Sequence, residues 1–149
     1  MPWNQSRALL VKWGEGTPLR VTLFLQAVSK YEDGAEACNC NLTGERNNDY
    51  HLVLGRTPNA PEKQSLTAET TPRIRRTNWD YDRLKALAKE KTYVRITGWA
   101  MLNTQHLGDK HPIRGTHWEI HPLTSIEVCT TTKAECDAGT GWKQLEELP

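Results

Sequence analysis

The clearest pattern in the chain is an alternation of polar and apolar residues between Arg114 and Cys129. In a β-strand, successive side chains point to opposite faces of the sheet. One face of this segment carries the apolar residues Trp118, Ile120, Ile126 and Val128. The other face carries His117, Glu119 and His121. The pattern predicts a half-buried strand that displays a row of titratable groups.

Four other segments have strand patterns, and together with this one they give the order β-β-β-α-β-β. The additional strands are expected at residues 18–31, 49–54, 64–71 and 92–102. A helix is expected between the third and fourth strands, with Asn78 as its N-terminal cap. Its apolar stripe consists of Tyr81, Leu84, Leu87 and Ala88. Gly98, inside the fourth strand, indicates a bulge or a sharp bend.

The same alternation assigns the inward faces of the strands. In the first strand, the predicted inward residues are Leu19, Val21, Leu23, Leu25 and Ala27. In the second strand, the predicted inward residues are Tyr50, Leu52 and Leu54, which leaves Asp49 and His51 on the outer face. In the third strand, Glu69 is on the face opposite Leu66 and Ala68. Titratable groups are therefore expected on the outer faces of three strands.

This order of elements resembles the OB-fold, a five-stranded Greek-key barrel. The resemblance spans about residues 18–129 and implies an all-β barrel with one α-helix between strands three and four. At 149 residues the chain is one ordinary domain, residues 1–149. Residues 130–149 are expected to form a loosely docked C-terminal tail, anchored by Trp142 and Leu145.

Three phrases of the sequence are also similar to a recurrent, uncharacterised bacterial domain. They are Asp49-Tyr-His-Leu-Val-Leu54, Arg95-Ile-Thr-Gly-Trp99 and Arg114-Gly-Thr-His-Trp-Glu-Ile-His-Pro122. This likeness implies no activity.

Composition excludes some classes of function. The net charge of +1 gives no overall attraction to nucleic acid or anionic membranes, so any basic binding surface must be local. No run approaches the roughly 18 apolar residues of a transmembrane helix, so no transmembrane segment is predicted. The first residues lack the apolar core of a signal peptide. We expect a cytoplasmic protein if this start is native, and a secreted or periplasmic one if a signal peptide was removed.

The four cysteines leave three states open: unpaired thiols, a disulfide or a metal site. Cys38 and Cys40 are too close in sequence for an easy mutual disulfide, and their spacing is poor for zinc. Cys129 and Cys136 flank a short turn and could bridge readily. A bridge would place the protein outside the cytosol.

The first candidate site lies on the outer faces of strands two, three and five. The third strand of an OB barrel neighbours both others, so His51, Glu69, Glu119 and His121 are predicted to form one patch. Residues four apart on a strand are ~13 Å apart, so His117 and His121 cannot chelate one ion together. The patch is either a solvated face of His–Glu pairs, a ligand surface, or the site of a metal-dependent hydrolase. A divalent metal is the one cofactor considered, and no other is predicted.

The second candidate site is the pair of connections that OB-folds use for ligands, after strands one and four. They contain Lys30 and Arg46, and then His106, Lys110, His111 and Arg114. Cations beside an exposed Trp99 would suit a single-stranded nucleic acid, which is the predicted ligand. A protein partner is the remaining interpretation. The basic cluster Arg73, Arg75 and Arg76 is expected to be solvated.

Leu54-Gly-Arg-Thr-Pro58 resembles the segment of staphylococcal-type nucleases in which an arginine and an acidic residue follow the second strand. The resemblance implies Ca²⁺ held by carboxylates and phosphate clamped by arginines. The matching groups here would be Asp49, Glu62, Glu69, Arg56 and Arg95. The paired aspartates of that family are not at the expected positions.

Overall fold

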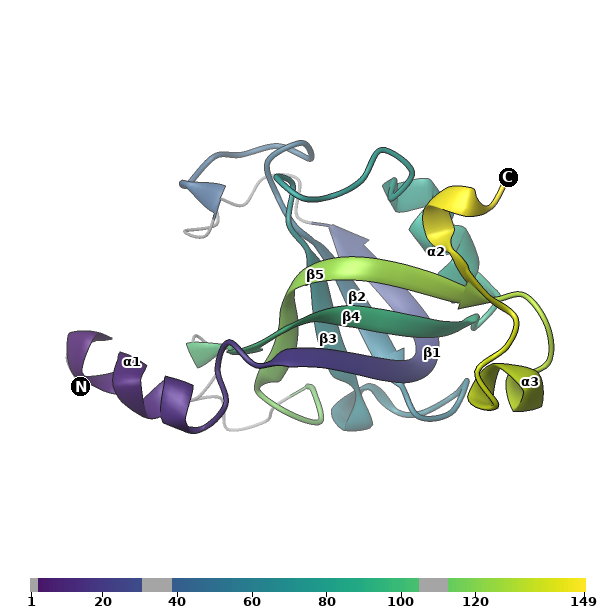
Figure 1. Ribbon diagram of the computed structural model, residues 1–149. Coiled ribbons are helices and arrows are strands. Elements are labelled where there is room, and N and C mark those ends of the chain that lie inside the picture. Colours follow the sequence, from purple (N-terminus) through teal and green to yellow (C-terminus); the bar gives the residue numbers. More distant parts are fainter. Residues whose placement is uncertain (1–2, 31–38, 105–112) are drawn as a thin grey trace.

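Five strands close into a barrel in the computed structural model, which describes residues 3–30, 39–104 and 113–149 (Figure 1). The strands are β1 (Pro18–Lys30), β2 (Tyr50–Gly55), β3 (Leu66–Thr70), β4 (Tyr93–Leu102) and β5 (Trp118–Cys129). Their order is β3-β2-β1-β4-β5, and a parallel pairing of β3 with β5 closes the cylinder. The predicted five-stranded, OB-like barrel is confirmed.

Short helices flank the barrel. The α-helices are α1 (Trp3–Lys12), α2 (Tyr81–Lys89) and α3 (Lys133–Asp137), and the 3-10 helices are η2 (Glu62–Gln64) and η4 (Leu145–Glu147). Helix α1 projects away from the barrel, whereas α2 lies against it between β3 and β4 in the chain (Figure 1). No helix in the described part of the chain has the length and apolar character needed to cross a bilayer.

The inside of the barrel is filled by the apolar faces that the alternation predicts. Leu52 and Leu54 from β2 and Ile96 from β4 are fully buried, and Leu84 of α2 packs against the same core. Two inward assignments in β1 are wrong. Leu19 is exposed at the start of the strand, and Val28, not Ala27, packs against this core. A bulge at Gln26 shifts the register and thereby reverses the faces of the residues that follow it.

The bulge predicted at Gly98 is confirmed, because the pairing of β4 with β5 shifts register on both sides of this residue. A Cβ atom at Gly98 would lie 2.4 Å from the side chain of Ile120 and 2.6 Å from the carbonyl oxygen of Pro122. Only glycine therefore allows β5 to approach this closely. The consequence is that β5 bends around the barrel and still returns Ile126 to the core.

Helix α2 begins later than predicted. Its N-terminal cap is Asp80, whose carboxylate accepts a hydrogen bond of 2.8 Å from the backbone N–H of Arg83. The predicted cap, Asn78, instead donates to the carbonyl oxygen of Glu146 at 3.2 Å. Asn78 thus attaches the C-terminal segment and does not start the helix.

The C-terminal segment is an integral part of the fold, so the prediction of a loosely docked tail is wrong. The strand β6 (Trp142–Gln144) pairs with β5, and Leu145 is fully buried in the barrel core. The predicted anchors, Trp142 and Leu145, are correct. The disulfide between Cys129 and Cys136, also predicted as a possible bridge, closes the turn that leads back to β6.

Candidate functional site

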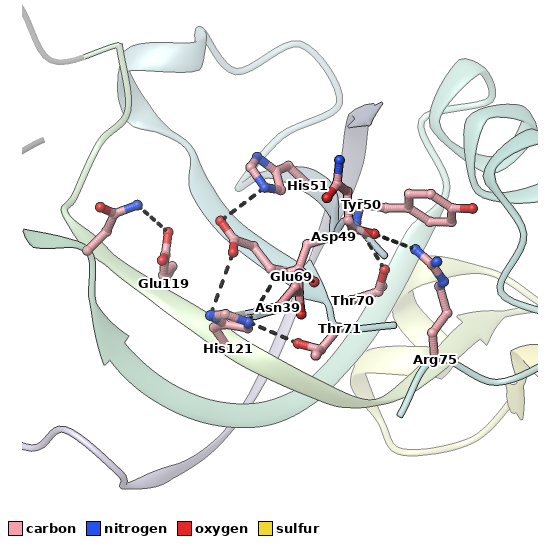
Figure 2. A network of polar contacts seen from close by, with 12 residues as sticks. Asn39, Asp49, Tyr50, His51, Glu69, Thr70, Thr71, Arg75, Glu119 and His121 are labelled. Atoms are coloured by element: carbon pink, nitrogen blue, oxygen red, sulfur yellow. Dashed lines mark hydrogen bonds and ion pairs between the residues drawn. The ribbon is translucent and has the colours of Figure 1, made fainter. Parts of the chain in front are cut away.

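Titratable side chains converge where the outer faces of β2, β3 and β5 meet. His51 is opposite Glu69 in the pairing of β2 with β3. The parallel pairing of β3 with β5 aligns Thr67 with Glu119 and so brings β5 beside the same face. As predicted, His51, Glu69, Glu119 and His121 lie together, and Asp49 joins them (Figure 2). We call these five residues the carboxylate–imidazole cluster.

The cluster is not a solvated face of the barrel. Asp49, Glu69, Glu119 and His121 are each less than a tenth exposed, and the side chain of His51 is 14% exposed. Burying several carboxylates and imidazoles together is expensive unless they are paired or serve a ligand. The burial therefore excludes the simplest alternative, a set of water-exposed cross-strand pairs.

His121 lies between two carboxylates. Its Nε2 atom is 3.1 Å from Oδ2 of Asp49 and 2.9 Å from the hydroxyl oxygen of Thr71. Its Nδ1 atom is 3.6 Å from Oε2 of Glu69. The other oxygen of Glu69 is 3.5 Å from Nε2 of His51, so Glu69 faces two imidazoles (Figure 2).

The other two carboxylates are held from the connections between strands. Asn39, which precedes β2, donates a hydrogen bond of 2.9 Å to Oδ1 of Asp49. After β4, Asn103 and Arg114 reach Oε2 of Glu119 at 3.3 Å and 2.8 Å. Both connections that OB barrels use for ligands thus contribute directly to the cluster.

Proximity and burial change the acidities of the central groups. Burial, and then the charge of Glu119, raise the pKa of Glu69 to about 8, against the opposing effects of His121 and Arg114. Burial lowers the pKa of His121, but the hydrogen bond to Asp49 and the nearby carboxylates outweigh it, so the net pKa is raised. Near neutral pH the cluster therefore retains protons that exposed carboxyl groups would lose.

The arrangement also suits a metal ion. Among the described residues, Asp49, Glu69 and His121 each offer one ligand atom, and these atoms lie within 4.8 Å of one another. A mixed set of carboxylate oxygens and an imidazole nitrogen is a common set of protein metal ligands.

Other predicted binding residues lie outside the cluster or cannot be placed. Trp99, on β4, is 44% exposed, as the predicted stacking role requires. His117 is partly buried, and none of the ion pairs of the cluster among the described residues includes its side chain. His106, Lys110 and His111 lie outside the described residues, as does Cys38. Cys40 is a free, exposed thiol.

The basic cluster after β3 is more engaged than predicted. Arg73 contacts the sulfur of Cys40, and Arg76 pairs with Glu146 at 2.7 Å. The guanidinium of Arg75 lies 3.8 Å from the ring centre of Tyr50 and donates to the backbone carbonyls of Glu45 and Asn48. These arginines contact neighbouring segments of the chain. Arg73 and Arg76 are nevertheless exposed, as expected, whereas Arg75 is partly buried.

The groups suggested by the nuclease resemblance do not assemble into one site. Arg95, a predicted phosphate clamp, forms an ion pair with Glu127 on the outer face of β4 and β5. Glu62 lies exposed in η2, and Arg56 is exposed just after β2. Only Asp49 and Glu69 of that set belong to the carboxylate–imidazole cluster.

Sequence reasoning did not include Asn39, Asp49, Thr71 and Asn103 in the binding set. Asp49 carried a signal, because it is two residues before His51 and so shares its face. Asn39 and Asn103 lie in connections without a periodic pattern, and only the fold places them at the cluster.

No protein-family model matches the chain, and searches of curated proteins and of solved structures find no match. Function is therefore inferred from the geometry and chemistry of the described residues.

Proposed function

We propose that the protein is a small ligand-binding module that binds single-stranded nucleic acid at the carboxylate–imidazole cluster and the connections beside it. One observation supports this most strongly: buried polar groups from three strands and both connections converge on the face that OB barrels use for oligonucleotides. If this face of the barrel had only a structural role, apolar side chains would fill it without the free-energy cost of burying carboxylates and imidazoles.

The chemistry of the cluster suits bases better than phosphates. Carboxylates repel phosphate groups, but they accept hydrogen bonds from the exocyclic amino groups of bases such as cytosine, which would here replace the hydrogen bonds from Asn39 and Asn103. The exposed ring of Trp99 offers a stacking surface for a neighbouring base. Phosphates would be bound by the cations predicted in the connection after β4, Lys110 and His111.

Binding of labelled oligonucleotides, followed by fluorescence anisotropy, tests this function. We expect oligo-dC to bind more tightly than oligo-dT, because thymine lacks the amino group that a carboxylate would accept from. Affinity should fall steeply between 50 and 200 mM salt if phosphates are contacted. The substitution Trp99→Ala should weaken binding about 5- to 100-fold, the loss expected for one stacked base.

Matched variants separate this site from general surface effects. Trp13→Ala removes another exposed tryptophan, and Lys143→Ala removes a lysine on β6. Neither should change the affinity or its salt dependence, whereas Lys110→Ala should reduce the salt slope by about 0.7, the value for one phosphate contact. Weak binding that does not respond to salt, or equal losses in all four variants, would contradict the proposal.

A metal-dependent hydrolase is the second candidate, and the paired imidazoles and carboxylates favour it. A carboxylate beside an imidazole orients the ring and raises its basicity as a metal ligand. Asp49 is placed in this way relative to Nε2 of His121, at 3.1 Å. Phosphodiesters are the substrate class, because metal ions and bases together activate water for attack on phosphorus.

Hydrolysis of bis(p-nitrophenyl) phosphate with added Mn²⁺ or Zn²⁺ tests the second candidate. Wild-type protein should show metal-dependent release of nitrophenol. His121→Gln should lower the rate by about 100-fold, because it removes a ligand of the metal ion that the reaction requires. His117→Gln, on the same segment but outside the cluster, should leave the rate unchanged. No turnover by the wild type, or equal rates in the two variants, would exclude hydrolysis at this site.

The disulfide indicates the compartment in which the protein would bind such a ligand. Cys129 and Cys136 are bridged, and structural disulfides persist in oxidising compartments. The proposal therefore places the protein outside the reducing cytosol.

A further inference from the structure

We propose that Asp49, Glu69 and His121 form a binding site for one divalent transition-metal ion, Mn²⁺ or Zn²⁺. This inference goes beyond nucleic-acid binding and does not depend on it. The three residues come from the entrance of β2, from β3 and from β5, so the site exists only because the barrel closes through the pairing of β3 with β5.

The distances already approach those of a metal site. Protein ligands lie about 2.0–2.2 Å from such an ion, so adjacent ligand atoms are about 3.0–3.6 Å from each other. Nδ1 of His121 is 3.6 Å from Oε2 of Glu69, and one atom from each of the three residues lies within 4.8 Å of the others. Asp49 faces Nε2 of His121 and Glu69 faces Nδ1, so coordination of one ion by all three residues would require the imidazole or the Asp49 side chain to rotate.

A second observation concerns Nδ1 of His121. This atom is buried, forms no hydrogen bond, and is aimed at Glu69 across a distance too long for one. The opposite nitrogen, Nε2, is 2.9 Å from the hydroxyl of Thr71. Nε2 also lies 3.1 Å from Oδ2 of Asp49. A histidine whose ring is held by hydrogen bonds at one nitrogen, with the other nitrogen left for the ion, is the usual arrangement in a metal site.

Charge and donor type indicate which ions would bind. Within the described residues, the cluster contains three carboxylates, of which Glu119 is paired with Arg114. A divalent cation would displace the protons that the cluster retains near neutral pH and would compensate the charge of the other two carboxylates. Ca²⁺ prefers six to eight oxygen ligands and Mg²⁺ a full octahedron, whereas an imidazole with two carboxylates suits Mn²⁺ or Zn²⁺. Three protein ligands also leave a position open for water or another molecule.

Titration of chelator-treated protein with Mn²⁺, followed by electron paramagnetic resonance without oligonucleotide present, tests this site. We expect one Mn²⁺ per chain and, in pulsed spectra, a nitrogen coupling that disappears in His121→Gln. Asp49→Asn and Glu69→Gln should each weaken binding at least 10-fold, as expected for loss of one ligand. Asp82→Asn and Glu62→Gln, the same changes at exposed positions, should leave affinity unchanged.

Thermal unfolding provides a readout that also shows whether each variant is folded. Mn²⁺ at 100 times its dissociation constant should raise the Tm of the wild type by about 5–10 °C. Glu69→Gln keeps the side-chain shape and removes one of the clustered charges, so it should unfold cooperatively but gain clearly less from the same Mn²⁺ concentration than the wild type does. The proposal is overturned by the absence of saturable binding, by wild-type affinity in Asp49→Asn or Glu69→Gln, or by an equal loss in the exposed controls. Because oligonucleotide is absent, none of these results depends on nucleic-acid binding.

Discussion

Replacement of Arg114 by methionine is expected to lower the free energy of unfolding by about 3 kcal/mol. Arg114 is 2.8 Å from Glu119, whose side chain is almost completely buried at 1% exposure. Methionine retains most of the apolar stem but leaves the carboxylate of Glu119 without its positive partner. An uncompensated buried charge is costly, since the protein interior solvates it poorly.

A double-mutant cycle separates the charge effect from lost packing. Glu119→Gln removes the buried charge, so Arg114→Met should cost much less in that background than in the wild type. Urea unfolding of the four proteins measures this difference. The control is Arg56→Met, which removes an exposed arginine and should change stability by less than about 0.5 kcal/mol. Equal costs of Arg114→Met in both backgrounds would show that the arginine contributes only through packing.

Leu145→Ala is expected to lower the free energy of unfolding by about 3 kcal/mol, within the range for buried leucines. Leu145 is fully buried although it lies only four residues before Pro149, because it directly follows β6, which pairs with β5 at the barrel. Alanine would leave a cavity that the surrounding side chains fill only in part. For a domain of this size the Tm should fall by about 6–12 °C.

Calorimetry without reductant measures this effect while the Cys129–Cys136 disulfide is intact. Leu42→Ala is the matched control, since Leu42 is half exposed and its truncation should change the Tm little. A loss below about 1 kcal/mol for Leu145→Ala would mean that the C-terminal segment does not belong to the cooperative core.

Much of the barrel could be predicted because strand alternation is a local property. Tyr50, Leu52 and Leu54 point inward as their spacing requires, and Gly98 marks the bulge between β4 and β5. The failures have causes that the pattern of hydrophobic residues does not reveal. The bulge at Gln26 is fixed by hydrogen bonds of 3.0 Å from its amide to the carbonyls of Thr57 and Ala60, which are more than 30 residues away.

The candidate site was partly predictable for the same reason. Alternation along each strand puts His51, Glu69, Glu119 and His121 on outward faces. The strand order of an OB barrel then makes those three strands neighbours, so the four side chains share one outer wall. That wall was expected to be exposed to solvent. Alternation along a strand distinguishes its two faces, but it does not show which other segments of the chain cover a face. Asn39, Asn103 and Arg114 cover and bind the cluster from the connections.

The sequence by itself determined which side chains share a face, because the β-pleat repeats every two residues whatever the strand pairs with. Only the tertiary structure decided that Asp49, Glu69 and His121 lie within reach of one ion. Their convergence requires the parallel pairing of β3 with β5, between residues about 50 positions apart, and their acidity depends on the burial that follows. Burial and electrostatic coupling are sums over neighbours in space, and those neighbours are fixed only when the barrel has closed.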